Sequence, residues 1–529
     1  MKNAFRFGLF IALFIARAGS AAIVYVDAGH CPSGDGSSWA TAFCTIQEGI
    51  NAAGTGDGVF VKKGTYAEFV TMRSGVYLFG GFLGTESLPE QRDISSNDTV
   101  IDVSSLPTGT RAVSMRDLDN TRLDGFVIRG ATSGGVMTEN LTSRCSIGNC
   151  RFENNSTSFG ADNGAAILVD APISIDNCSF IQNRASVSGG ALSIYSSGVS
   201  LTGCLFDGNQ SPTGGAIYTS GAEITINACN FVSNKADFGG AVTCEGTVSF
   251  EACSFFSNSA SIQGGTLYTP SQGVYNGLIE LRRCIVEYSS APNGEAAIDL
   301  NRCDSQILDS LISRNACIGV AMNKGAHNIS QCTLTNNPGS AIYANGEASV
   351  TVSNTILASS PDAAIAIASD GTSVAPGSCL FFKNAVDISI GATVVSGGDN
   401  INANVPGAVD NLTGDPAFRN AAAQDFHLLA TSAAIGMAAA IYATYTDLDG
   451  VARPTVDGQI DIGAYQFTDA VPPTVLSITR ADASPTKAGL VHYNVVFDEA
   501  VQGVSSNDFA VVALSSAKAV SGASVTSVT

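Results

Sequence analysis

The chain has 529 residues, which is too long for one ordinary globular core, so it must form several domains or a repeat array. Glycine is frequent, with 56 residues, only 14% of residues are charged, and there is one tryptophan; this composition favours many short strands over long helices. The formal net charge of −20, without a cluster of Lys and Arg to neutralise phosphates, argues against a nucleic-acid partner.

The first 22 residues have the pattern of a secretory signal peptide. Lys2 and Arg6 precede an apolar run over residues 7–15, and small residues follow at 18–22. Arg17 ends the apolar run before the about 18 residues that a membrane-spanning helix needs, and no later stretch is long enough. We therefore expect an exported chain, extracellular or on the cell surface, with no membrane span after cleavage.

The central region repeats with a period of 25 residues. Five glycines follow one another at this interval, and four of them begin a Gly-Gly pair: Gly164, Gly189, Gly214, Gly239 and Gly264. Each unit continues with an apolar strand, a loop, an alternating strand, and a third strand of the form Cys-x-Phe that an asparagine follows three positions later. These third strands are Cys150/Phe152/Asn155, Cys178/Phe180/Asn183, Cys204/Phe206/Asn209, Cys229/Phe231/Asn234, Cys253/Phe255/Asn258 and Cys379/Phe381/Asn384. The pattern predicts a solenoid with three short strands in each coil.

Stacking explains why such a repeat folds. A single coil cannot cover its own apolar face, but coils about 4.8 Å apart hydrogen-bond through parallel strands and place equivalent residues above one another. We therefore predict inward columns of Phe and Cys, a corner column of Asn whose amides bond to neighbouring coils, and the tightest corner at Gly-Gly. A longer coil inserts residues 270–276, which we expect to form a surface loop suited to function.

The fourteen cysteines fall into two classes. Most share one position of the repeat, where Ser310 and Thr355 also occur, so we expect them to be buried, unpaired small side chains. Cys31 and Cys44 lie outside the repeats and are the best candidates for a disulfide. A zinc site is not expected, because no CxxC pair occurs and the four histidines are scattered.

These units resemble the Gly-Gly-Ala-Ile and Phe-x-x-Asn repeats of polymorphic outer-membrane proteins, and the whole resembles secreted right-handed parallel β-helix proteins of the pectin-lyase-like fold class. Flanking motifs are similar to the ends of such bacterial surface proteins: Tyr25-Val26-Asp27, residues 36–43, 64–66, 80–86 and 91–93, and later residues 447–450, 453–454 and 461–465. The resemblance implies an N-terminal cap with the first strands at 23–98, an all-β right-handed helix at 99–395, and C-terminal coils with a capping motif at 396–468. It specifies architecture and not activity, because this fold hosts lyases, hydrolases, adhesins and spacers.

After Pro472-Pro473 the composition changes to alternating strands over residues 475–479, 491–497 and 509–514. This segment, 474–529, is similar to the opening strands of a bacterial immunoglobulin-like domain, a partial β-sandwich. It has too few strands for a closed sandwich, so we expect the sequence to be a fragment of a longer protein.

The closing motif contains the weak candidates for a metal site. Asp447-x-Asp449-Gly450 resembles a calcium loop but lacks the other ligand positions of an EF-hand. The alternative that we favour is that these carboxylates bond turn amides and Arg453 in the cap. We therefore expect no cofactor, with calcium at Asp447 and Asp449 as the alternative.

Three tyrosines are the candidate ligand-binding residues. Tyr218, Tyr268 and Tyr343 each follow an inward residue after the glycine corner, so they should point outward in one column. Aromatic faces could support a glycan. Ser193 and Thr243 interrupt the column, which favours the interpretation that these are ordinary exposed tyrosines.

A polysaccharide lyase on this fold would need acidic residues that hold a cation and an Arg or Lys that acts as base. Basic residues cluster only at Arg282, Arg283 and Arg302, near Glu280, Asp299 and Asp304. The interpretation that we favour is a solvated surface patch, and we assign no catalytic residue.

The sequence thus favours a non-catalytic extracellular or cell-surface scaffold, adhesin-like or spacer-like, with cell-surface glycans or other surface proteins as partners. The alternative is a polysaccharide lyase or glycoside hydrolase of the pectin-lyase-like fold.

Overall fold

The structure is a computed structural model that describes residues 21–142, 144–157, 163–272, 277–292, 294–368, 370–440, 446–453, 460–468, 474–482, 490–497 and 509. Residues 1–20 of the expected signal peptide lie outside this part. The chain divides into two units, Met1–Phe467 and Thr468–Thr529, which are described separately.

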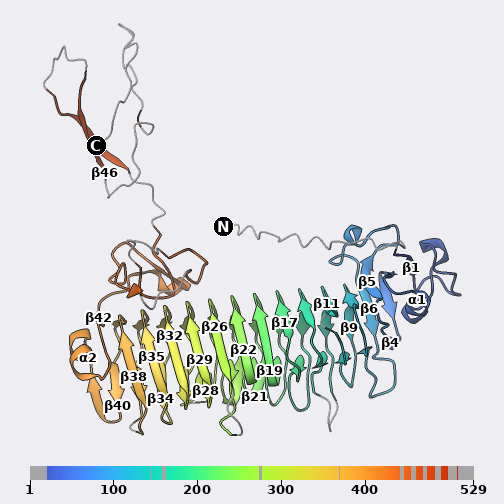
Figure 1. Ribbon diagram of the computed structural model, residues 1–529, viewed down its shortest axis with the longest axis horizontal. Helices are drawn as coiled ribbons and strands as arrows, with labels where there is room; N and C mark the ends of the chain where they lie inside the picture. The colour runs from blue at the N-terminus through green and yellow to red at the C-terminus, as the bar shows by residue number, and fades with distance from the viewer. Residues whose placement is uncertain are drawn as a thin grey trace. The chain divides into compact units, whose positions relative to one another are not determined.

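The first unit is a right-handed parallel β-helix, as predicted (Figure 1). Two parallel sheets run along the described stack, and each coil contributes its Cys-x-Phe strand to a sheet of 14 strands. These strands are β3 (Gly64–Tyr66), β6 (Thr99–Asp102), β9 (Val127–Arg129), β12 (Arg151–Glu153), β15 (Ser179–Ile181), β18 (Leu205–Asp207), β20 (Asn230–Val232), β23 (Ser254–Phe256), β27 (Ile285–Glu287), β30 (Leu311–Ser313), β33 (Thr333–Thr335), β36 (Ile356–Ala358), β39 (Leu380–Phe382) and β42 (Leu412–Thr413).

The other two strands of each coil form one larger sheet, because they are continuous in β19 and β22. Its described strands are β1 (Ile23–Val26), β2 (Gly58–Lys62), β4 (Val70–Thr71), β5 (Tyr77–Phe82), β7 (Val113–Arg116), β8 (Arg122–Asp124), β10 (Val136–Glu139), β11 (Ser146–Gly148), β13 (Ile167–Asp170), β14 (Ser174–Asp176), β16 (Leu192–Ile194), β17 (Val199–Thr202), β19 (Ile217–Asn227), β22 (Val242–Glu251), β25 (Leu267–Tyr268), β26 (Leu278–Arg282), β28 (Ala296–Asn301), β29 (Asp304–Leu308), β31 (Ile318–Asn323), β32 (Ala326–Ser330), β34 (Ile342–Asn345), β35 (Ser349–Ser353), β37 (Ala363–Ile367), β38 (Ser373–Gly377), β40 (Val386–Ile390) and β41 (Thr393–Val395).

The predicted inward columns are present. Phe180, Phe206 and Phe231 pair residue by residue, are fully buried, and stack with ring centroids 4.7 Å apart. The twelve cysteines outside the N-terminal segment are buried and unpaired, and Cys31 and Cys44 form the disulfide. Burial of one apolar side chain per coil in each column supplies the favourable free energy that an isolated coil lacks.

The predicted asparagine column is a continuous hydrogen-bond ladder. Each side-chain amide donates to the side-chain oxygen of the next coil at 3.0 to 3.1 Å, through Asn155, Asn183, Asn209, Asn234 and Asn258. The ladder satisfies buried polar groups at a corner that has no sheet partners.

The Gly-Gly pair does form the tightest corner. Gly189 has φ +58°, a conformation that side chains with a Cβ adopt only with strain. A Cβ at Gly190 would lie 2.0 Å from the carbonyl oxygen of Gly215, so the next coil leaves no room for one.

A third, shorter ladder lies between the Asn corner and the glycine corner and was not predicted. Strands β21 (Lys235–Phe238) and β24 (Ser259–Gln263) pair in parallel. Single bridges extend the ladder through Ser156, Arg184 and Gln210.

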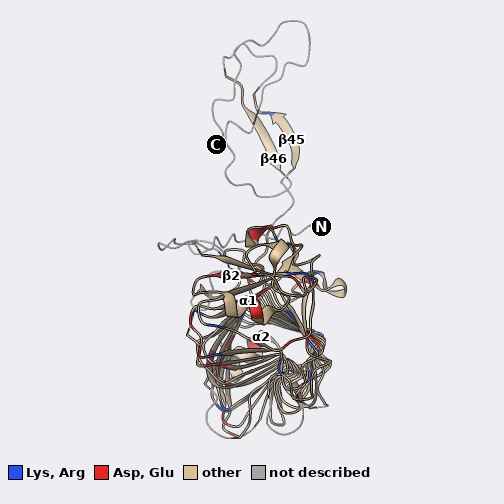
Figure 2. Ribbon diagram, turned by 90° about the vertical axis from the view of Figure 1, so that its right-hand side faces the viewer, with Lys and Arg blue, Asp and Glu red and all other residues tan. Residues whose placement is uncertain are grey.

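Short helices close the two ends of the solenoid core. Helix α1 (Ile46–Ala52) begins after Thr45, which exchanges capping hydrogen bonds with Glu48. Helix α2 (Gly398–Asn404) follows the antiparallel pair β40–β41. Ile46 and Ile50 of α1 and Ile401 of α2 belong to the same buried cluster as the coils, and both helices appear within the outline of the stack in Figure 2. Single 3₁₀ turns occur at Trp39–Thr41, Pro89–Gln91 and Ala421–Ala423.

The closing motif lies along the side of the solenoid and not over its end, where we expected it. The described residues of 414–440, 446–453 and 460–467, with the hairpin of β43 (Phe418–Asn420) and β44 (Asp425–Leu428), pack on the outer face of the 14-stranded sheet. Leu428 and Ile462 contact Ile356 and Leu380, and Phe426 lies against Leu311. Several outward positions of these later strands are apolar, among them Ile285, Leu311 and Ile356, so they require a cover.

The second unit contains one described hairpin. Strands β45 (Val475–Arg480) and β46 (Tyr493–Phe497) pair antiparallel, in the positions predicted for the first two strands of this segment. Apart from Phe509, the predicted third strand lies outside the described residues, and the immunoglobulin-like assignment stays a prediction.

Candidate functional site

The three candidate tyrosines do share one column on the outer face of the larger sheet. Successive partners along this column are Ser193, Tyr218, Thr243, Tyr268, Asp299, Ala321 and Tyr343. The column therefore includes Asp299, which we had placed with the arginine cluster. Tyr343 is five coils from Tyr218, about 24 Å by strand spacing, so it stands apart.

The side chains of the column differ in exposure. Tyr218 and Tyr343 are half-buried, whereas Tyr268 is only 7% exposed, contrary to our expectation of an outward, accessible ring. Phe238, from the third ladder of the preceding coil, packs on Tyr268 with ring centroids 5.3 Å apart. The corner loop thus folds over the column at this coil and covers the ring.

Tyr218 belongs to an aromatic pair that the sequence did not reveal. Tyr195, 38% exposed, lies with its ring centroid 6.0 Å from that of Tyr218. The Tyr218 hydroxyl donates to Glu245 at 3.1 Å, and Asn163 donates to the Tyr195 hydroxyl at 2.6 Å. Partial burial and the Glu245 carboxylate raise the pKa of Tyr218 to about 12, so its hydroxyl stays protonated. We call Tyr195 and Tyr218 the tyrosine pair. The sequence feature that could have located it is the alternation of strand residues, which places Tyr195 on the same outward face as Ser193.

Asp299 lies next to Tyr268 in the column and is buried. It accepts a hydrogen bond from the Asn301 amide at 2.9 Å. Burial, with a smaller effect of Glu295, raises the pKa of Asp299 to about 7. A buried carboxyl group with a pKa near neutral therefore lies on this face of the sheet, at the coil where the period lengthens.

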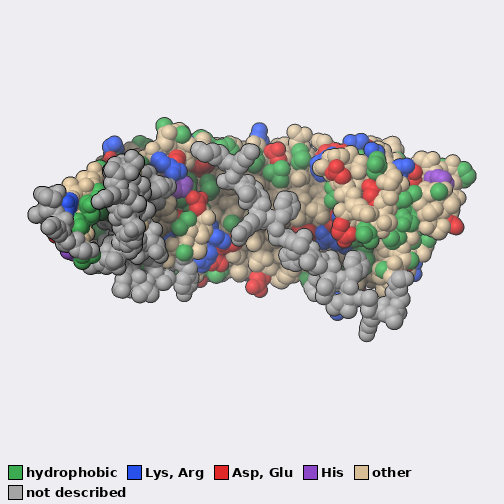
Figure 3. All heavy atoms as spheres, turned by 90° about the horizontal axis from the view of Figure 1, so that it is seen from above, with side chains coloured by type: hydrophobic (Ala, Val, Ile, Leu, Met, Phe, Trp, Pro, Cys, Tyr) green, Lys and Arg blue, Asp and Glu red, His purple; other side chains and the backbone are tan. Residues whose placement is uncertain are grey.

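The structure brings together only part of the arginine cluster. Arg282 pairs with Glu280 at 3.3 Å and with Glu251 at 3.7 Å, and Arg283 also pairs with Glu251. Glu251 was not among our candidates. On the face seen in Figure 3, basic and acidic side chains likewise lie beside one another in several places.

The remaining members point elsewhere. Arg302 lies in the turn between β28 and β29, and Asp304 accepts a hydrogen bond from the Ala326 amide at 2.8 Å. Asp299 bonds Asn301, as described above. This arrangement fits the interpretation of a charged surface better than that of a single catalytic centre.

The carboxylates of the closing motif have protein partners. The two oxygens of Asp447 accept backbone N–H groups from Val451 at 2.7 Å and Gln466 at 2.9 Å, which agrees with the turn-amide interpretation. Asp449 lies 2.7 Å from Nε2 of His427. Arg453, which we expected to bond these carboxylates, instead pairs with Asp309 of the solenoid at 3.3 Å.

His427 lies between two carboxylates, because Asp425 is 2.7 Å from its Nδ1. The hydrogen bond to Asp449, despite partial burial, raises the pKa of His427, with Asp425 acting in the same direction. Among the described residues, no group of three or more His, Cys, Asp and Glu side chains is arranged to hold a metal ion.

No helix in the described part of the chain combines the length and hydropathy required to cross a bilayer.

The chain is similar to several solved structures and to one family model. A pectate lyase structure is 14% identical and covers 85% of this chain and 97% of its own, with a TM-score of 0.41. The A-module of a mannuronan C-5 epimerase from Azotobacter vinelandii is 14% identical, covering 70% and 94%, with a TM-score of 0.32. The tailspike protein of Escherichia coli bacteriophage HK620, solved with a pentasaccharide, is 12% identical, covering 70% and 79%, with a TM-score of 0.34. No curated protein matches the chain. The model of the right-handed β-helix region family matches residues 111–279.

Proposed function

We propose that the chain is an exported, non-catalytic β-helix scaffold that binds glycans of a cell surface or matrix through its outward tyrosines. The observation that carries this proposal is the tyrosine pair on the outer face of the larger sheet, with Tyr195 directly after β16 and Tyr218 in β19. Tyr195 is exposed, and Tyr218 is half-buried beside it.

The chemistry of this pair suits a sugar. Aromatic faces accept the apolar C–H face of a sugar ring, while hydroxyl and carboxylate groups at the rim bond its hydroxyls. Tyr218, Glu245 and Ser220 supply such a rim, since the hydroxyls of Tyr218 and Ser220 both donate to Glu245.

A rigid support favours binding. The pair stands on strands whose inward neighbours, Ile194 and Ile217, are fully buried in the stack. Because the backbone is already ordered, binding orders few additional groups.

The test is a glycan-binding measurement on the full exported chain. We expect Tyr195→Ala and Tyr218→Ala each to weaken binding on a panel of neutral surface glycans about tenfold. Tyr493→Ala is the matched control, because Tyr493 is 59% exposed in the second unit. Unchanged binding in both variants would contradict the proposal.

The alternative function is a polysaccharide lyase or hydrolase, and the observation in its favour is the group of Arg282, Arg283, Glu251 and Glu280. Both guanidinium groups already bind Glu251, so neither is held free above a substrate. Release of unsaturated or reducing ends from a polysaccharide panel, abolished in Arg282→Gln, would establish the enzyme and exclude the scaffold.

Export is part of the proposal and rests on the charged and apolar pattern of residues 1–22. A fusion of residues 1–30 to a reporter enzyme that is active only after export tests it. We expect reporter activity, and its loss when charged residues interrupt the apolar run at 7–15.

A further inference from the structure

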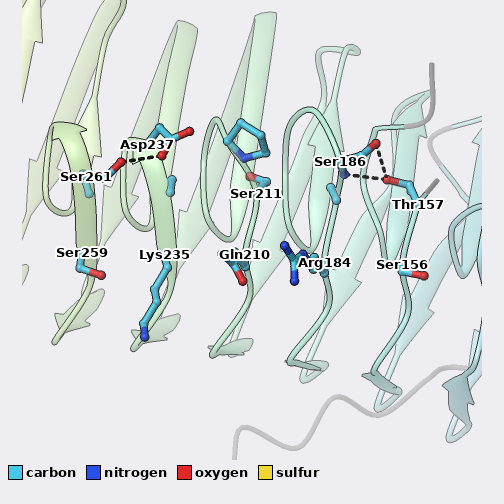
Figure 4. Close-up of a pocket in the computed structure, with 14 residues that line it drawn as sticks. Ser156, Thr157, Arg184, Ser186, Gln210, Ser211, Lys235, Asp237, Ser259 and Ser261 are labelled. Atoms are coloured by element: carbon cyan, nitrogen blue, oxygen red, sulfur yellow. Dashed lines mark hydrogen bonds between the residues drawn. The ribbon is translucent and has the colours of Figure 1, made fainter. Parts of the chain in front are cut away.

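A groove runs along the third ladder, on the corner that follows the asparagines. Its volume is about 840 Å³, and it spans five successive coils from Ser156 to Ser261 (Figure 4). It shares no residue with the tyrosine pair.

Small side chains make this corner hollow. The position after each ladder residue is Thr157, Ala185, Ser211, Ala236 or Ala260. The three alanines have no side-chain atoms beyond Cβ, so few side-chain atoms occupy the space within the corner loops.

One wall of the groove is a row of outward side chains that differ from coil to coil. Ser156, Arg184, Gln210, Lys235 and Ser259 form this row in Figure 4, and their backbones bridge in parallel. Arg184, Gln210 and Lys235 are exposed. We call these three residues the cationic row.

The row carries two exposed cations in an acidic protein. Elsewhere on the coils, Arg122, Arg129, Arg151 and Arg282 bind carboxylates. Among the described residues, no carboxylate forms an ion pair with Arg184 or Lys235, so both remain available to an external anion. Asp237, the acidic lining residue, lies on the opposite wall and accepts a hydrogen bond from Ser261.

The distance between the two cations of the row determines the distance that must separate the acidic groups of a complementary ligand. Stacked rings place neighbouring coils 4.7 Å apart here, so Arg184 and Lys235 are separated by two such steps. The amide of Gln210 stands between them. The length of two coil steps is comparable to the length of one disaccharide in an extended glycan. Over that length the protein presents a cation at each end and a neutral hydrogen-bonding group between them.

We propose that this groove binds a linear glycan that carries an acidic group on every second sugar, with Arg184 and Lys235 on successive acidic groups. Gln210 bonds the neutral sugar between them. Asp237 and the serine hydroxyls of the opposite wall accept and donate hydrogen bonds to sugar hydroxyls. The chain of the glycan runs along the solenoid axis, across coils.

The test measures binding of hyaluronan oligosaccharides, in which uronates alternate with neutral N-acetylated sugars, to the full chain. We expect Arg184→Gln combined with Lys235→Gln to weaken binding on the order of tenfold, and higher salt to weaken wild-type binding. Lys324→Gln is the matched control, since Lys324 is exposed on a turn outside the groove.

Several results would overturn the proposal. These are no binding by the wild type, equal binding by the double variant, an equal loss in Lys324→Gln, or equal or tighter binding of a uronate homopolymer or a neutral glycan of the same length. Tyr218→Ala separates this site from the tyrosine pair: we expect it to leave hyaluronan binding unchanged, so either site can fail while the other stands.

Discussion

The side-chain amide of Asn183 donates to the side-chain oxygen of Asn209 at 3.0 Å, and both residues are completely buried. The same Asn209 oxygen accepts the backbone N–H of Asn183, and the Asn209 amide donates to the Phe180 carbonyl and to Asn234. One side chain therefore satisfies polar groups of both neighbouring coils.

Asn209→Ala should therefore be strongly destabilising. It leaves buried donors and acceptors of neighbouring coils without partners, and we expect a loss of about 3 kcal/mol in the free energy of unfolding. The midpoint of urea unfolding measures it. Asn328→Ala, at a half-exposed position on β32, is the control and should change stability by less than about 0.5 kcal/mol. Equal effects of the two substitutions would show that the ladder adds no stability.

The ion pair between Arg453 and Asp309 should hold the C-terminal segment on the side of the solenoid. Both side chains are 1% exposed, and Arg453 also donates to the Gly463 carbonyl at 2.9 Å. Arg453→Ala removes the buried cation that faces Asp309, with a loss of about 3 to 5 kcal/mol. We expect protease cleavage between residues 412 and 467 while the coils stay intact.

Two further variants test the cause of that release. Arg419→Ala removes an exposed pair with Asp425 and should leave the cleavage rate unchanged. Adding Asp309→Asn to Arg453→Ala should restore part of the protection, because it removes the buried negative charge that Arg453 no longer balances. Without such restoration, the release would come from lost packing and not from charge.

The repeat could be predicted from the sequence because equivalent residues recur in equivalent places. Phe180, Phe206 and Phe231 share size and chemistry, so their column follows from the spacing alone. The same holds for the asparagines and the glycine corner, whose roles depend on backbone contacts with the next coil.

The side docking of the closing motif could not be predicted from that motif alone. The missed signal lies in the outward strand positions, which change from Arg151 and Ser179 in early coils to Ile285, Leu311 and Ile356 in later ones. An apolar outer face of a parallel sheet indicates that something covers it.

Among the candidate site residues, the tyrosine column was predicted but the exposure of its members was not. Alternation places Tyr268 on the outer face, but whether Phe238 folds over it depends on the path of a corner loop. The path of a loop depends on contacts that the period of a repeat does not specify. The third ladder and its groove were missed for the same reason.

The buried thiols should be unreactive in the folded chain. Burial raises the pKa of Cys244, Cys332 and Cys379, and a thiol reacts as its thiolate. We expect almost no reaction of the native protein with a thiol reagent such as DTNB and a titre of twelve after denaturation. A rapid reaction of several thiols in the native protein would contradict the buried column.

Asp299 should make stability fall as the pH rises. Burial, with a smaller effect of Glu295, raises its pKa in the folded chain from 3.8 to about 7. Between these values the folded state binds one proton more than the unfolded state, so the free energy of unfolding decreases with rising pH. The shift corresponds to at most about 4 kcal/mol.

Asp299→Asn removes this titration while it keeps the size of the side chain. We expect the variant to lose less stability than the wild type between pH 4 and pH 8 in urea unfolding, with the two curves closest at the acid end. Asp207→Asn, at a half-exposed position on β18, is the control and should follow the wild type. Parallel curves for the wild type and Asp299→Asn would mean that Asp299 does not titrate in this range. A difference that grows with pH would show that the Asp299 carboxyl beside Tyr268 holds its proton near neutrality.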